Sequence, residues 1–165
     1  MLALDARPND AHIKLAQLEK SGKLSAVVTQ NIDGLHQMAG SKKVLELHGS
    51  ILRSYCSACH RPYPADKMNH GEGVPRCICG GVIRPDIVLY EEPLDDRIVS
   101  EAIKCISEAE VLIIGGTSLN VYPAAGLINY YRGNKLALVN LSSTPYDSEA
   151  DLVIHEKIGK VFSQI

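Results

Sequence analysis

Four cysteines lie within 24 residues of one another, and this grouping restricts the possible folds more than any other feature. They form two close pairs, Cys56-x2-Cys59 and Cys77-x-Cys79, with 17 residues between the pairs. Two close pairs joined by a loop let four thiolates converge tetrahedrally on one zinc ion. Four thiolates leave no coordination position open. The spacing therefore predicts one structural Zn2+ site and not a catalytic one.

Free thiols or two disulfides are the alternatives for the same four cysteines. The chain starts without the basic and then apolar layout of a secretory signal peptide, so we expect a cytoplasmic location, where disulfides are rare. His60 and His70 lie close in sequence, but four sulfurs suffice, and we expect both to be surface residues. Cys105 falls on the apolar stripe of a predicted helix, which favours a buried packing cysteine.

Composition excludes several classes of protein. The chain has 165 residues, 45% of them apolar and 22% charged, which is typical of one globular domain or one domain with a small insertion. No apolar run reaches the length of a transmembrane helix, so we expect no membrane association. With 17 basic and 19 acidic residues, the net charge is −2, which argues against electrostatic binding of nucleic acid.

Apolar periodicity predicts strands that alternate with helices. Helices are expected at residues 10–20, 95–110, from about 123 onward, and 158–165. Strands are expected at residues 24–28, 44–47, 83–90, 111–114, 135–140 and 151–155. This order predicts an α/β fold with a mostly parallel sheet, in which the fully apolar run 111–114 is central. Residues 53–81 lack periodicity and predict a small irregular module.

Polar residues follow the predicted strands at several places. Clusters at residues 29–36, 116–120 and 140–142 each come directly after a strand, and His48 ends another. In parallel sheets, ligands bind beyond the carboxyl ends of the strands, so these clusters indicate a nucleotide pocket. Taken singly, Asn and Asp at such a position are usually helix caps, which applies to Asn31 and Asp33, and His48 alone is also consistent with a turn.

Several ordered motifs resemble the sirtuin family of NAD-dependent protein-lysine deacetylases and deacylases. They are TQNIDGLHQMAG (29–40), ELHG (46–49), the two cysteine pairs, GGVIRPDIVLYEE (80–92), GTSLNVYPAA (116–125) and LVNLS (138–142). The resemblance implies a Rossmann-like NAD-binding domain with helices on both faces of its sheet, at residues 1–52 and 82–165, and an inserted zinc-binding module at 53–81. The family's N-terminal Gly-rich NAD-binding turn has no match, so the sequence resembles an N-terminally truncated sirtuin.

The resemblance also implies roles for individual residues. His48 matches the catalytic histidine, which acts as a general base on a ribose hydroxyl. Cofactor contacts match Gln30, Asn31, Ile32, Asp33, Gly116, Thr117, Ser118, Asn140 and Ser142. Substrate contacts match Val88, Leu89, Tyr90, Glu91 and Val121, and the zinc ligands match Cys56, Cys59, Cys77 and Cys79. Glu91 stands where the family commonly has Gly.

The implied activity is removal of acyl groups from lysine in proteins or peptides, with release of nicotinamide and O-acyl-ADP-ribose. NAD and one structural Zn2+ are the implied cofactors. Two alternatives stay open from the sequence. One is a catalytically inactive fragment that acts as a zinc-containing binding or scaffold protein, and the other is a mono-ADP-ribosyltransferase. Neither acyl-chain preference nor oligomeric state follows from these motifs.

Overall fold

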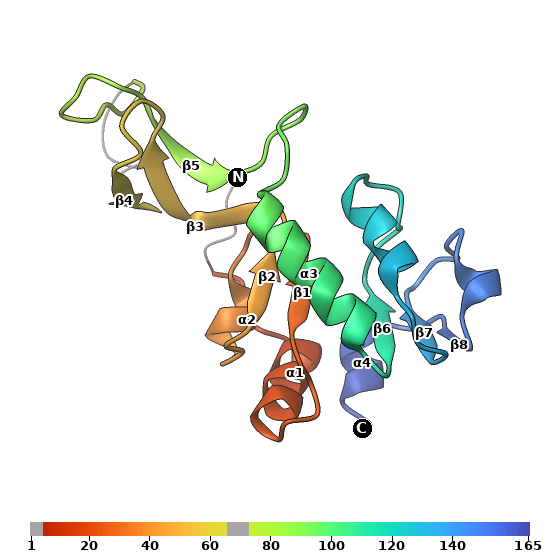
Figure 1. Ribbon diagram of the computed structural model, residues 1–165. Helices are drawn as coiled ribbons and strands as arrows, with labels where there is room; N and C mark the ends of the chain where they lie inside the picture. Colours follow the sequence, from red (N-terminus) through yellow and green to blue (C-terminus); the bar gives the residue numbers. More distant parts are fainter. Residues whose placement is uncertain (1–4, 66–72) are drawn as a thin grey trace. The chain divides into compact units, whose positions relative to one another are not determined.

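A computed structural model describes residues 5–65 and 73–165 of the chain (Figure 1). The chain divides into two compact units. The first contains the chain up to Val28, residues 35–45 and residues 96–165. The second contains Thr29–Gly34 and Glu46–Asp95, and therefore the whole zinc-module segment predicted at residues 53–81.

Helix α1 (Asp10–Lys20) begins in the first unit as its sequence predicts. The Asn9 side chain accepts a hydrogen bond from the His12 amide at 3.2 Å, and the His12 ring accepts one from the Asn9 amide, which satisfies two amides that the helix leaves unpaired. Gly22, at φ +74°, follows the helix end. Helix α1 packs against α2 (Leu35–Met38) and against α4 (Ile158–Phe162), whose Phe162 is buried.

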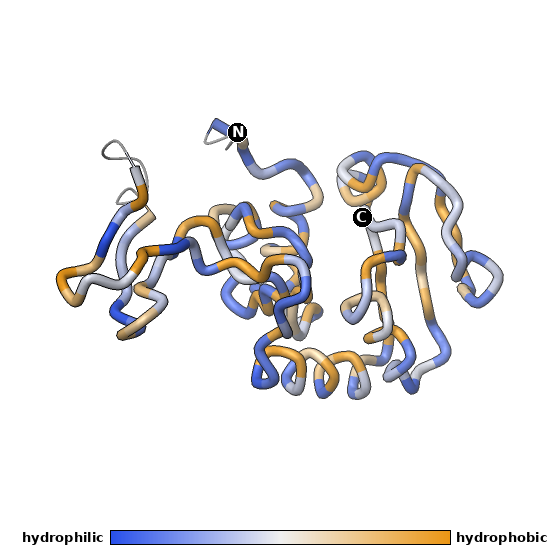
Figure 2. The backbone as a smooth tube through the Cα atoms, turned by 90° about the horizontal axis from the view of Figure 1, so that it is seen from above, coloured by the Kyte–Doolittle hydropathy of each residue, from blue (hydrophilic) through white to orange (hydrophobic). Residues whose placement is uncertain are grey.

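Three parallel strands form the sheet of the first unit, in the order β6 (Leu112–Gly115), β7 (Leu136–Val139) and β8 (Leu152–Ile154). The 3₁₀ helix η2 (Ala124–Tyr130) connects β6 to β7, and η3 (Asp147–Glu149) connects β7 to β8. Helix α3 (Asp96–Glu108) precedes β6 and buries Ala102 and Ile106, and apolar and polar residues alternate along its turns (Figure 2). The predicted α/β class with a parallel sheet is confirmed.

Strand β6 departs from its prediction. It lies at the edge of the described three-stranded sheet, and Ile113 is 44% exposed. A run such as Leu-Ile-Ile is typical of a strand covered on both faces and paired on both sides, but here β7 pairs with it on one side. The segment after Pro123 is also a 3₁₀ helix and not the expected α-helix. Cys105 is half-buried, with its sulfur 3.9 Å from a Glu101 carboxylate oxygen, and is not the fully buried residue expected.

Strands β1 (Val27–Thr29) and β2 (Val44–Glu46) form a separate two-stranded sheet. The Val27 amide donates to the Lys43 carbonyl at 2.9 Å, and the Leu47 amide donates to the Thr29 carbonyl at 2.9 Å. Both strands are shorter than predicted. Their carboxyl ends lead directly into the polar segments at Gln30 and His48.

Strand β3 (Gly49–Cys56) organises the second unit, with β4 (Pro62–Pro64) and β5 (Ile83–Ile87) antiparallel on either side of it. Strand β3 was not predicted, and part of it falls in the irregular module expected at residues 53–81. The reason is that two of its three buried residues, Ser50 and Ser54, are polar while Leu52 is exposed, so the apolar alternation that marks a strand is absent. The register with β5 is also interrupted between Ser50 and Ser54.

No helix in the described residues combines the length and apolar character that crossing a membrane requires.

Replacing Leu138 with Ala should destabilise the first unit. Leu138 is 1% exposed and packs in a core cluster with Leu119 and Ala125. Removing three buried carbons leaves a cavity, so we expect the free energy of unfolding to fall by about 2–5 kcal/mol. Leu141→Ala is the control, because Leu141 is 63% exposed and should change the value by less than about 0.5 kcal/mol. Urea denaturation of both variants measures the difference, and equal midpoints would contradict the assigned core.

Candidate functional site

His48 lies between β2 and β3, and one backbone carbonyl fixes its ring. The Nδ1 atom of His48 lies 3.0 Å from the Gln30 carbonyl oxygen. A carbonyl oxygen only accepts hydrogen bonds, so Nδ1 carries the proton in this contact. In the neutral ring, Nε2 then has a free lone pair. This tautomer suits a general base that removes a proton from a hydroxyl group.

The backbone next to His48 is also restricted, at Gly49. Its φ is +75°, and a Cβ atom built there would lie 2.1 Å from the Asp86 carbonyl oxygen, a distance that no side chain tolerates. The Val88 amide also donates to the His48 carbonyl at 3.1 Å. The end of β5 is therefore bound directly to the backbone of the histidine, and only glycine permits this approach.

The segment from Gln30 to Gly34 is anchored at two points within the second unit. The Thr29 hydroxyl accepts a hydrogen bond from the Asn31 amide at 3.1 Å, and the Ile51 amide donates to the Ile32 carbonyl at 3.0 Å. Asn31 is exposed, whereas Ile32 and Asp33 are half-buried. The structure thus brings Gln30 into contact with His48 and ties the residues that follow to β3.

A turn after β5 carries the predicted substrate residues Val88, Leu89, Tyr90 and Glu91. The Glu92 amide donates to the Leu89 carbonyl at 3.1 Å and closes the turn. Glu91 takes its third position with φ +70°, a conformation that favours Gly. Tyr90 is fully exposed at the tip.

An ion pair that was not predicted from the sequence, Arg84–Glu92, holds this turn. The Glu92 carboxylate accepts two hydrogen bonds from the Arg84 guanidinium, at 2.6 and 2.8 Å, and one from the Leu89 amide at 2.9 Å. The Arg84 contact is the main reason that the pKa of Glu92 falls to about 2. Nothing in the local sequence marks this pair, because the two residues lie on either side of a strand end.

The polar clusters of the first unit meet at one edge of its parallel sheet. Gly115 on β6 is in register with Val139 on β7, so the residues that follow each strand emerge together. They are Gly116, Thr117 and Ser118 after β6, and Asn140 and Ser142 after β7. Val121 follows in the loop before η2 and is exposed.

The backbone at this edge is suited to a ligand. Gly116 has φ +65°, and a Cβ atom added there would meet no atom within 4 Å, so open space lies beside it. The Thr117 hydroxyl accepts a hydrogen bond from the Leu119 amide at 3.2 Å, and the Asn140 side chain donates to the Ser142 carbonyl at 2.9 Å. Carboxyl edges of parallel sheets are the usual place of nucleotide binding.

The four predicted metal ligands come together in the second unit. The sulfur atoms of Cys56 and Cys79 are 3.5 Å apart, those of Cys59 and Cys77 are 3.6 Å apart, and all four lie within 4.8 Å of one another. A tetrahedral zinc ion with Zn–S bonds of about 2.3 Å requires sulfur separations of about 3.8 Å. The four thiols fit a structural zinc site.

Hydrogen bonds around the sulfurs favour thiolates and also show why a cation is needed. The Cys79 amide and the Tyr63 hydroxyl, which is 3.1 Å from the sulfur, lower the pKa of Cys77 to about 6. The Gly81 amide lowers the pKa of Cys79, but the thiols of Cys59, Cys56 and Cys77 raise it to about 12 overall. Four negative charges therefore repel one another unless a cation lies between them. A Zn2+ ion supplies that charge.

Two further features of this module agree with the set of four ligands. A Cβ atom on Gly81 would lie 2.7 Å from the Cys56 sulfur, so glycine is required beside the metal ligand. His60 is exposed, as expected, and its ring stacks on Tyr55 with 6.1 Å between the ring centroids. His70 lies outside the described residues.

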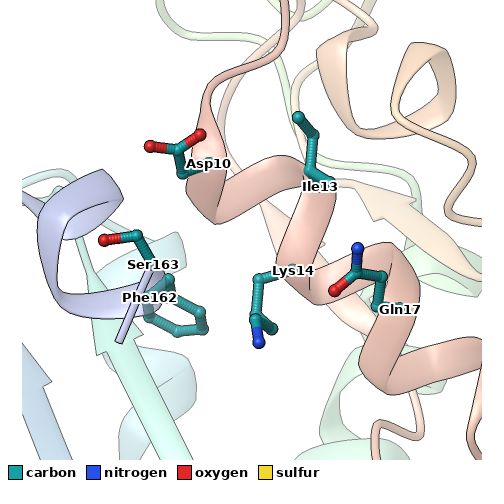
Figure 3. A pocket seen from close by; sticks show the side chains of 6 residues that line it. All are labelled: Asp10, Ile13, Lys14, Gln17, Phe162 and Ser163. Atoms are coloured by element: carbon teal, nitrogen blue, oxygen red, sulfur yellow. The ribbon is translucent and has the colours of Figure 1, made fainter. Parts of the chain in front are cut away.

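An open surface pocket of about 230 Å³ lies between α1 and α4 in the first unit (Figure 3). Its lining residues are Asp10, Ile13, Lys14, Gln17, Phe162 and Ser163. It contains none of the residues predicted to bind NAD, substrate or zinc.

Comparison with known proteins decides the family. The sequence model of the Sir2 family matches residues 1–123. The chain belongs to the Sir2 family. It is 63% identical over 163 residues to an NAD-dependent protein deacetylase of Clostridium perfringens, a match that covers 98% of this chain and 67% of the relative. It is 58% identical to one of Clostridium acetobutylicum, over all of this chain and 68% of the relative. The chain thus spans about two thirds of the length of these relatives.

Solved Sir2 structures have the same fold. In a structure of Sir2 with a p53 peptide and NAD+, the protein is 44% identical in sequence to this chain and superposes with a TM-score of 0.92. The match covers 98% of this chain and 70% of the Sir2 chain. A second solved structure contains Sir2 with an inhibitor, 2'-O-acetyl-ADP-ribose and a deacetylated p53 peptide. It superposes with a TM-score of 0.91, and the match covers 98% of this chain and 71% of the Sir2 chain. The predicted family and its α/β fold are confirmed.

Elemental analysis of freshly purified, reduced protein should give about one zinc ion per chain. Cys56→Ser removes one buried thiolate and should lower the zinc content by at least tenfold at equal chelator concentration. Cys105→Ser is the matched control, because Cys105 lies outside the group of four. Zinc content that is unaffected by Cys56→Ser would contradict the ligand set.

Glu91→Gly should stabilise the chain. A side chain at φ +70° costs about 1–2 kcal/mol, and glycine removes that strain although it adds freedom to the unfolded chain. We expect a net increase of about 0.5–1 kcal/mol in the free energy of unfolding. Glu91→Ala keeps the strain and should give no increase. Chemical denaturation tests both variants, and a decrease with glycine would argue against the turn.

Proposed function

We propose that the chain acts as an NAD-dependent protein deacetylase, which removes acyl groups from lysine and releases nicotinamide and O-acyl-ADP-ribose. Relatives with this name share up to 63% of its residues. The observation that carries the proposal is the ring of His48, because the Gln30 carbonyl holds it in the tautomer that a general base needs.

NAD, when bound, supplies a ribose carbon whose bond to nicotinamide breaks. His48 would accept the proton of a ribose hydroxyl at Nε2, while Nδ1 stays bonded to the Gln30 carbonyl. Because Gly49 and Val88 fix the backbone of the histidine, the base is positioned before any ligand binds. A catalytic role for His48 is part of this proposal.

Nine residues would contact NAD. We assign the nicotinamide and its ribose to Gln30, Asn31, Ile32 and Asp33. The adenosine and phosphate side belongs to Gly116, Thr117 and Ser118, where the open space beside Gly116 would admit a phosphate or ribose. Asn140 and Ser142, at the end of β7, would meet the adenine ribose.

An acyl-lysine protein or peptide would be the substrate. The exposed turn after β5 presents Val88, Leu89, Tyr90 and Glu91, and the loop before η2 presents Val121. Extended peptides bind to such exposed backbone as an added strand, with affinity from main-chain hydrogen bonds. The Arg84–Glu92 pair would keep the turn in shape for this pairing.

The remaining assignments follow the same interpretation. We propose residues 53–81 as the zinc module and 1–52 with 82–165 as a partial NAD-binding domain. Transfer of the acyl group to ADP-ribose makes the enzyme a transferase. A cytoplasmic location is supported by the four clustered free cysteines, since disulfides are rare in that compartment.

Nicotinamide release by the purified chain, with NAD and an acetyl-lysine peptide, tests the proposal. His48→Ala should lower the rate by about 10²- to 10⁴-fold, because it removes the general base. His60→Asn is the control, since His60 is exposed, has φ +55° and contacts no group proposed to react. Folding and zinc content of each variant are checked alongside.

The products separate the alternatives. O-acetyl-ADP-ribose that depends on His48 supports deacetylation. ADP-ribose attached to the peptide would indicate a mono-ADP-ribosyltransferase. No release of nicotinamide from folded, zinc-loaded protein would contradict both enzyme functions and favour a zinc-containing binding protein.

A further inference from the structure

His155 bridges two backbone segments beside the predicted adenine ribose contacts. It follows β8 directly, and its side chain is 45% exposed. Its Nδ1 atom lies 3.2 Å from the Asn140 carbonyl oxygen, and its Nε2 atom lies 3.3 Å from an Asp147 carboxylate oxygen. One ring therefore connects the end of β7 to η3.

The protonation state of the ring decides how many of its two partners it can satisfy. A backbone carbonyl and an ionised carboxylate can only accept hydrogen bonds. A neutral imidazole donates from one nitrogen, so it satisfies one partner, whereas the imidazolium donates to both. Hydrogen bonds from the Thr144 hydroxyl and amide, with the His155 charge, lower the pKa of Asp147 and keep it ionised.

Other charged groups belong to the segments around the ring. Glu149 on η3 is exposed, and Glu156 beside His155 is paired with Lys160 of α4 and accepts a hydrogen bond from the Lys157 amide. Asp147 is therefore the acidic residue whose carboxylate contacts the His155 ring.

The loop from Asn140 to Asp147 is closed by this bridge. At its start, the Asn140 amide donates to the Ile154 carbonyl at 3.1 Å, and its side chain donates to the Ser142 carbonyl at 2.9 Å. At its end, Asp147 accepts from the buried Thr144 hydroxyl at 2.7 Å. The His155 ring joins the two ends, so its charge acts on the shape of the whole loop.

We propose that His155 is a positioning residue whose protonated ring holds the Asn140–Asp147 loop in the shape that binds the adenosine half of NAD. The proposal rests on the proposed function, because that function assigns the ribose contacts to Asn140 and Ser142. Its consequence is a pH-dependent affinity. The bridge is complete when the ring is charged, at low pH, and one of its two bonds is lost as the pH rises and the ring becomes neutral.

Calorimetric titration of the full chain with ADP-ribose at pH 6 and pH 8 tests the proposal. ADP-ribose lacks nicotinamide, which separates the measurement from turnover. An exposed ion pair of this kind contributes modestly, so binding should be about two- to fivefold tighter at pH 6. His155→Gln and Asp147→Asn should each abolish that difference, and the double variant should add nothing further.

Hydrogen exchange without ligand gives a second readout. The protection of amides 140–147 should fall from pH 6 to pH 8 in the wild-type chain and should not change in His155→Gln. An equal pH dependence of affinity and protection in both proteins would overturn the role of His155. If the loop responds as expected but no variant binds ADP-ribose, the positioning of a nucleotide is overturned together with the proposed function, whereas the bridge itself is supported.

Discussion

The second unit depends on the approach of two backbones at Gly49 and Asp86. There is no room for a side chain at this point, and the close contact lets β5 pair with the first residues of β3. Strand β3 starts immediately after His48 and ends at Cys56. A single strand therefore fixes the candidate general base at one end and a metal ligand at the other. Loss of the zinc site should then also alter the position of His48, because β3 connects the two.

Helices and strands could be predicted from the sequence where apolar residues repeat at regular intervals, and were missed where they do not. The helix at Asp10–Lys20 was predicted with nearly the observed bounds, because a capping residue at Asn9 or Asp10 and an apolar stripe mark it. The strand Gly49–Cys56 was missed because serines occupy two of its three buried positions. The edge position of β6 was missed as well, since an apolar run does not reveal how many neighbours it has.

Part of the candidate site could likewise be predicted from the sequence and part could not. Cysteine spacing alone predicted the thiol cluster, because the ligand geometry of zinc is encoded in short local pairs. The catalytic role proposed for His48 came only from family resemblance, since a histidine before a glycine is compatible with an ordinary turn. The Gln30 carbonyl and the Arg84–Glu92 pair were beyond prediction, because each joins residues that only the folded backbone brings together.

The zinc site is asymmetric, and this has a chemical consequence. Cys56 and Cys77 are buried, whereas Cys59 and Cys79 are exposed. An oxidant or alkylating agent therefore meets the two exposed sulfurs first, while the Tyr63 hydroxyl further withdraws charge from the buried Cys77. Metal loss under oxidative stress would therefore begin at Cys59 and Cys79, while the buried Cys56 and Cys77 stay in place.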